Sequence, residues 1–183
     1  MRIPSGDRVR KVLGMGKVKI GGIIQSKELV QVGVMSIPDQ PGLAGKIFCA
    51  LGKEGINIQF IVHTGDLHGR GNTTFCIHQG DLQGTLKVLN LVQPFVGSEK
   101  VVYHSPVAII SIFGPHFREK PSIAGTMFSA LGDAGINILA ISTSISTLSC
   151  VIEEKLLPQA VQAISEAFEL PLAFLYPCRG NGR

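Results

Sequence analysis

The residues that could carry catalysis are five histidines and a run of hydroxyl side chains. No histidine has a carboxylate or a second histidine at metal-ligand spacing on one predicted element; the five are His63, His68, His78, His104 and His116. Ser142-Thr143-Ser144 and Ser146-Thr147 form a hydroxyl cluster, but no base accompanies them in an arrangement that activates a nucleophile. The glycines near the N-terminus lack the Gly-Lys-Ser/Thr ending of a phosphate loop. The sequence therefore predicts no enzyme site, no metal and no cofactor.

Small-molecule binding has better support, at two turns where a predicted strand leads into a predicted helix. Each turn offers free backbone N–H groups and the positive end of a helix, which suit a small carboxylate. Asp39 stands beside the first turn and can accept an ammonium group. Together these groups complement the two opposite charges of a free amino acid. The same residues also fit a capped turn without a ligand, and both interpretations stay open from the residues alone.

The first of these turns belongs to a stretch that occurs twice in the chain. Residues 41–58 and 121–138 are identical at eleven of eighteen positions, without a gap. Self-similarity at a fixed offset indicates that one supersecondary unit has been built twice. The 183 residues therefore predict two compact units of about 80 residues each.

Each copy shows the same order of elements. In the first, we expect strands at 18–24, 29–35, 56–62, 72–78 and 100–104, a helix from 43 with Pro41 in its first turn, a loop at 64–71, and a helix from 82 that Pro94 stops. In the second, we expect strands at 107–113, 136–142, 148–152 and 172–176, a loop at 115–120, and helices at 123–131 and 157–168. This βαββαβ order predicts an α+β fold of two tandem ferredoxin-like units with antiparallel sheets.

The predicted boundaries are a basic flexible leader at 1–17, a first domain at 18–105, a second at 106–178, and a tail at 179–183. Exposed sheet edges would remain unless the units pair side by side or across a dimer, so we expect a homodimer. The mean hydropathy of +0.31 indicates apolar surface for an interface, but no apolar run reaches the length of a membrane span.

The charge lies in the leader. The net charge is +4 overall, with +6 in residues 1–27 and −2 in the rest. The leader lacks a secretory signal's apolar core and has no interleaved aromatic residues, so we interpret it as a solvated tail rather than a nucleic-acid contact. The four cysteines (Cys49, Cys76, Cys150 and Cys178) show no metal-like spacing and are expected to be reduced and mostly buried, in a cytoplasmic protein.

The duplicated motifs resemble tandem ACT domains, specifically the regulatory region of aspartate kinases. In the first half, the resemblance rests on Ser36-Ile-Pro-Asp-Gln-Pro-Gly-Leu-Ala-Gly, Glu54-Gly-Ile-Asn-Ile and Asn72-Thr-Thr-Phe. In the second half, it rests on Gly114-Pro-His-Phe-Arg-Glu-Lys-Pro-Ser-Ile-Ala and Gly135-Ile-Asn-Ile-Leu-Ala-Ile-Ser-Thr-Ser. Together these stretches place the resemblance over roughly residues 18 to 178.

The resemblance implies an allosteric sensor of lysine, threonine or both, with effectors held between a first and a second ACT domain, commonly from different subunits. The effector-binding residues that it implies are Asp39, Pro41, Gly42, Leu43, Ala44, His63, Thr64, Asn137, Ile138, Thr143 and Ser144. It also implies that the chain end, residues 172–176, can complete the sheet of the first unit. The amino-acid kinase portion of the family is absent, so we expect no kinase activity from this chain alone and expect a catalytic chain as partner.

Two departures from the family pattern concern the effector. Ile145 stands where many members have glutamate, which weakens the case for reading a lysine ammonium there, and Ser122 replaces the familiar glycine of the second helix start. A different class of function also remains: a free-standing ACT sensor that controls transcription or another enzyme.

Overall fold

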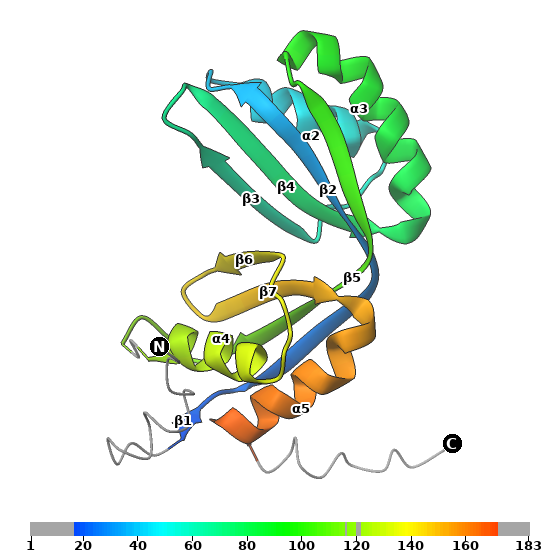
Figure 1. Cartoon of the computed structure of the whole chain (residues 1–183). Coiled ribbons are helices and arrows are strands. Elements are labelled where there is room, and N and C mark those ends of the chain that lie inside the picture. Colours follow the sequence, from blue (N-terminus) through cyan, green and yellow to red (C-terminus); the bar gives the residue numbers. More distant parts are fainter. Residues whose placement is uncertain (1–16, 116, 120–121, 172–183) are drawn as a thin grey trace. The chain divides into compact units, whose positions relative to one another are not determined.

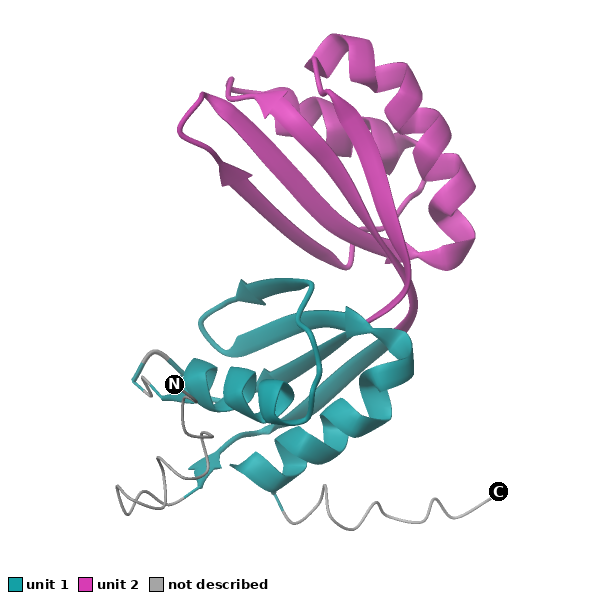
Figure 2. Ribbon diagram, in the orientation of Figure 1, with its two compact units in different colours: residues 1–26, 109–183 teal, residues 27–108 magenta. Residues whose placement is uncertain are grey.

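The structure of this chain is a computed structural model that describes residues 17–115, 117–119 and 122–171. It contains two compact units, coloured in Figure 2: unit 1, residues 1–26 and 109–183, and unit 2, residues 27–108. The strands are β1 (Val18–Lys19), β2 (Gly22–Pro38), β3 (Phe60–Gly65), β4 (Arg70–His78), β5 (Lys100–Phe113), β6 (Ala140–Thr143), β7 (Thr147–Glu153) and β8 (Phe168–Glu169). The α-helices are α2 (Leu43–Lys53), α3 (Leu82–Val96), α4 (Ile123–Asp133) and α5 (Leu157–Ala167), and short 3₁₀ turns occur at 79–81, 117–119 and 154–156.

In unit 2, α2 and α3 lie on one face of the sheet (Figure 1). Its strand order is β3–β4–β2–β5, and its chain order is the predicted βαββαβ. Val32 pairs with Phe75 across β2 and β4, and both side chains are fully buried under the helices. They join one apolar core with Ile47 and Leu89, and burial of each such side chain contributes about 1.5–3 kcal/mol.

The helix α2 forms where its apolar stripe predicts. Leu43, Ile47 and Leu51 are its buried residues, at the spacing of one helix face. The helix begins after Pro41 rather than with Pro41 in its first turn, because Gly42 takes a left-handed conformation with φ of 89°. A residue in the left-handed conformation cannot be part of a right-handed helix, so α2 starts only at Leu43.

The helix α3 runs past the proline that was expected to stop it. Pro94 lies in its last turn, where the missing N–H removes a single helical hydrogen bond, while the apolar face continues to the buried Val96. The helix instead ends at Gly97, whose φ is 64° and whose N–H donates to the Gln93 carbonyl at 2.9 Å. The glycine was the stronger stop signal.

Unit 1 has the same architecture with α4 and α5 as its helices (Figure 1). Its strand order is β2–β5–β7–β6, so its outer strand next to β5 comes from the N-terminal part of β2. A separate parallel pair joins β1 and β8, with Val18 opposite Phe168. The expected terminal strand at 172–176 lies outside the described residues.

The division of the chain differs from the predicted domains 18–105 and 106–178. Residues 18–26 cluster with 109–171 rather than with the first copy. The reason is that β2 and β5 are each one long strand, where the sequence suggested two short strands at 18–24 and 29–35, and again at 100–104 and 107–113. Both strands continue through the gaps left between those predicted segments, at 25–28 and 105–106, and both enter the two units.

Candidate functional site

The connection from β2 to α2, together with the first turn of α2, contains five of the residues predicted to bind an effector: Asp39, Pro41, Gly42, Leu43 and Ala44. The first N–H groups of a helix have no intrahelical acceptor, and at the start of α2 no side-chain cap replaces one. The Leu43 N–H makes a long contact, 3.5 Å, with the Gln40 carbonyl. The Leu43 side chain is buried in the core, so this residue can offer a ligand only its backbone. The connection otherwise presents exposed atoms.

The far end of the β3–β4 hairpin lies against this connection. The Asp39 N–H donates to the Gly69 carbonyl at 2.8 Å. A Cβ built on Gly65 would lie 3.8 Å from Asp39 Oδ2, so the carboxylate stands beside the end of β3. Thr64 immediately precedes this glycine and is exposed. The structure therefore brings Asp39 and the end of β3, predicted separately, to one place.

His63 lies on β3, with its ring over the neighbouring strand. A hydrogen bond of 2.8 Å joins its Nδ1 to the Thr73 hydroxyl. A Cβ on Gly71 would come within 2.7 Å of His63 Cε1, closer than side-chain carbons approach one another. Glycine at 71 is thus what allows the ring to lie where it does.

The hairpin turn is held by Asp66. Its Oδ1 accepts hydrogen bonds from the backbone N–H groups of His68 at 2.7 Å and Arg70 at 3.0 Å. These two donors, that of Arg70 first, lower the pKa of Asp66 below its usual value, so the carboxylate is ionised at neutral pH. Gly69 takes a φ of 71° and completes the reversal.

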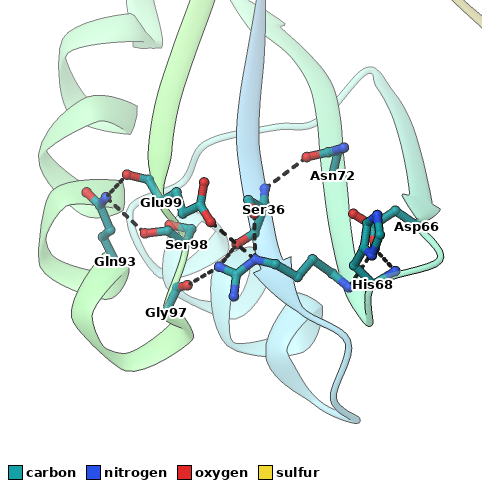
Figure 3. Close-up of polar contacts among 9 residues, drawn as sticks. Ser36, Asp66, His68, Asn72, Gln93, Gly97, Ser98 and Glu99 are labelled. Atoms are coloured by element: carbon teal, nitrogen blue, oxygen red, sulfur yellow. Dashed lines mark hydrogen bonds and ion pairs between the residues drawn. The ribbon is translucent and has the colours of Figure 1, made fainter.

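Arg70 makes the largest set of side-chain contacts in this region, with Ser36, Gly97 and Glu99, which are labelled in Figure 3. Its guanidinium donates to the hydroxyl and the carbonyl of Ser36 and to the Gly97 carbonyl, the last at 3.2 Å. Its Nε also lies 3.4 Å from a Glu99 carboxylate oxygen. The sequence analysis did not predict a role for Arg70, because its partners Ser36 and Gly97 are distant in the sequence. The one local signal that could have drawn attention to it is its position between two glycines, Gly69 and Gly71.

In unit 1, the predicted residues separate into two places. Asn137 and Ile138 precede β6, whereas Thr143 and Ser144 lie at or just beyond its other end. Four residues, 139–142, intervene, three of them in the strand, so the two pairs are roughly 15 Å apart along the chain. Within the described part of unit 1, these four residues do not form one cluster.

The Ser144 hydroxyl is already used inside its own turn. It accepts from the N–H groups of Thr147 at 3.1 Å and Ser146 at 3.4 Å. The Thr143 hydroxyl donates to the Ser144 carbonyl at 3.4 Å. A ligand would compete with these local bonds, whereas no such side-chain bond closes the start of α2.

The thiols and histidines supply no further centre among residues 17–115, 117–119 and 122–171. No group of three or more His, Cys, Asp or Glu side chains is placed to hold a metal ion there. Burial raises the pKa of both Cys76 and Cys150 to about 12, while Cys49 is exposed. None of the helices described is long and apolar enough to cross a membrane.

Comparison with known proteins identifies the repeated units. The ACT domain family matches residues 30–94 and again residues 110–168. The aspartokinase of a Thermus thermophilus strain is 31% identical over 170 residues, which are 92% of this chain and 42% of that protein. This chain therefore spans less than half of that relative.

Two solved structures match over nearly their whole length. The ligand-free regulatory subunit of aspartate kinase from Thermus thermophilus is 30% identical with a TM-score of 0.75, covering 82% of this chain and 99% of that chain. A chain from the structure of aspartokinase alpha and beta subunits is 29% identical with a TM-score of 0.74, covering 81% and 97%.

Proposed function

Because this chain belongs to the family of tandem-ACT regulatory subunits of aspartate kinase, we propose that it is an amino-acid-binding allosteric regulator of an aspartate kinase. The observation that carries this proposal is the match to 99% of the Thermus thermophilus regulatory subunit at 30% identity. The matched region takes in nearly the whole of that regulatory subunit and 82% of this chain.

The proposed effector is a free amino acid, threonine or lysine, as feedback sensing in the synthesis of aspartate-family amino acids would require. At unit 2, the uncapped first turn of α2 suits the carboxylate and the exposed Asp39 suits the ammonium. The proposed contacts in unit 1 are Asn137, Ile138, Thr143 and Ser144. Ile145 in place of a carboxylate favours threonine, because a lysine ammonium would gain no ion pair there.

The regulator would act on a separate catalytic chain and would have no kinase activity of its own. The alpha and beta subunits of aspartokinase, seen together in one solved structure, support a partner of this kind. A homodimer and a cytoplasmic location are further parts of the proposal. A ligand can shift activity only through its differential affinity for two arrangements of the assembly, so effector binding and kinase response should be linked.

Isothermal titration calorimetry with threonine, lysine and both together tests the effector. We expect heat of binding and a raised melting temperature at millimolar threonine, since binding to the folded state stabilises it by mass action. Asp39→Asn should weaken binding while leaving the fold unchanged, because this exposed side chain is outside the core. An absence of heat and of thermal shift with every one of these ligands, in a protein confirmed to be folded and dimeric, would overturn the effector assignment.

A further inference from the structure

The segment that leads into the β2–α2 connection has a backbone that needs support. Ser36 has a φ of 56°, a conformation that residues other than glycine seldom adopt, and the pairing of β2 with β4 shifts register between Val34 and Ile37. Ser36 stands three residues before Asp39. A relaxation of this irregularity would therefore move the residues proposed to bind the effector.

Two side chains of β4 hold every polar group of Ser36 (Figure 3). The Asn72 side-chain oxygen accepts from the Ser36 N–H at 2.8 Å. Arg70 donates to both the Ser36 hydroxyl and its carbonyl. Hydrogen bonds from a charged donor are stronger than those between neutral groups, so Arg70 is the principal support.

Arg70 also ties this segment to the end of α3. It donates to the Gly97 carbonyl, and a Cβ on Gly97 would lie only 3.3 Å from Pro38 Cγ. Next to this contact, the Glu99 N–H donates to the Met35 carbonyl at 3.1 Å. The side chain of Arg70 is one-third exposed, so its bonds to the carbonyls are partly shielded from water.

The described residues of unit 1 place no arginine at the equivalent point. His63 opposite Thr73 corresponds in register to Thr143 opposite Leu148, so nine residues close the unit 2 hairpin and four close that of unit 1. Counted back from these pairs, the position of Arg70 is taken by Ile145, which is 63% exposed. Beside this turn, the Gly114 N–H donates to the Ser146 carbonyl at 2.9 Å. In unit 1, the hairpin turn therefore contacts the residue after β5 through a backbone hydrogen bond and not through an arginine side chain.

We propose that Arg70 is a positioning residue that fixes the β2–α2 connection of unit 2 in the conformation that receives the effector. The role in effector binding rests on the proposed function, whereas the hold on the connection stands on the contacts of Arg70 alone. Under this proposal, Arg70 preorganises the strand-to-helix turn of unit 2 for effector binding. The equivalent turn of unit 1, before α4, has no such support among the described residues.

Hydrogen–deuterium exchange of the ligand-free full chain tests the hold directly. The amides of Ser36, Asp39 and Lys46 are all hydrogen-bonded and report on the connection. In Arg70→Ala, we expect their exchange to accelerate about tenfold or more, with unit 1 unchanged. Arg70→Lys should restore part of the protection, because an ammonium keeps one charged donor but loses the planar fork.

Effector affinity supplies the second measurement. In Arg70→Ala, we expect the Kd for the bound amino acid to rise about tenfold or more, and in Glu99→Gln to change less than twofold, because the carbonyl bonds remain. Leu89→Val, a core change in the same unit, serves as the stability-matched control and should leave both the amide pattern and the Kd as in the wild type.

The outcomes separate the two claims. Unchanged exchange at 36–46 in Arg70→Ala, or equal acceleration in Leu89→Val, would overturn the positioning role whatever the wild type binds. Accelerated exchange with an unaltered Kd would remove its link to the effector. A wild type that binds no amino acid would refute the proposed function, while the exchange result would still decide whether Arg70 holds the connection.

Discussion

Units 1 and 2 carry equivalent helices, α4 after β5 and α2 after β2, but the chain enters the two helices by different turns. In α2 the buried residues are Leu43, Ile47 and Leu51, and in α4 they are Ile123, Met127 and Leu131, eighty positions later. The turn before α2 has Gly42 at φ 89°, whereas the turn before α4 has Ser122 at φ −84°. The duplication has kept the buried stripe of the helix and changed the turn that precedes it.

The largest effects should be equal in the two units, because they concern the shared core. Leu51 and Leu131 are equivalent and fully buried. Replacing either with alanine should lower the free energy of unfolding by about 2–5 kcal/mol, from lost burial and the cavity left behind. Urea denaturation of Leu51→Ala and Leu131→Ala measures this. Losses that differ by more than about 2 kcal/mol would contradict equivalent cores.

The next effect should differ between the units. Gly42→Ala places a Cβ in a left-handed conformation and should cost about 1–2 kcal/mol, even though no atom lies within 4 Å of that Cβ. Ser122→Ala, at an ordinary φ and with no side-chain cap bond to lose, should change the free energy of unfolding by less than about 0.5 kcal/mol. Thermal denaturation compares the pair. Equal losses would show that the two turns are not different in kind.

The sequence predicted the helices and the order of strands because these depend on local signals repeated in both copies. The stripe of Leu43, Ile47 and Leu51 and its repeat at 123–131 predicted the buried faces of both helices. The single span of β2 was missed because strand continuity depends on a partner, and its partner in unit 1 is β5, a strand that lies far from it in the sequence.

The sequence predicted only those residues of the candidate site that belong to a continuous sequence motif. Asp39 and the residues after it follow from one turn, and the hairpin residues His63 and Thr64 from the family resemblance. The supporting contacts were not predictable: Arg70 meets Ser36 at a separation of 34 residues and Gly97 at 27. Such contacts depend on register and on a bulge, neither of which leaves a periodic signal.

A smaller effect should again be shared between the units. Cys76 and Cys150 are both buried, and their pKa values are raised from 9.0 to about 12 in the folded state. A raised folded pKa means that their contribution to stability is complete below pH 9 and is lost as pH rises from 9 towards 12, when the unfolded thiols ionise. Cys76→Ala and Cys150→Ala should each reduce this alkaline loss of the free energy of unfolding.

The three described cysteines should also differ in accessibility. At neutral pH, iodoacetamide should modify the exposed Cys49 before Cys76 and Cys150.

The smallest effect should separate the two hairpin turns by acid. Asp66 closes the unit 2 turn as an ionised acceptor of two backbone N–H groups, whereas the neutral Ser144 closes that of unit 1. The pKa of Asp66 is lowered by folding, so its support is complete above its unfolded pKa near 4 and is lost as pH falls through the lower folded value. The amides of His68 and Arg70 should therefore lose protection from hydrogen exchange in acid, once the rates are corrected for intrinsic exchange, while the amide of Thr147 should not.

Variants of the two turns supply the control. Asp66→Asn should abolish this acid dependence, with Ser144→Ala as the matched control in unit 1. Equal acid sensitivity of both turns would contradict this prediction. It would mean that the response to acid does not depend on having the Asp66 carboxylate in one turn and the Ser144 hydroxyl in the other.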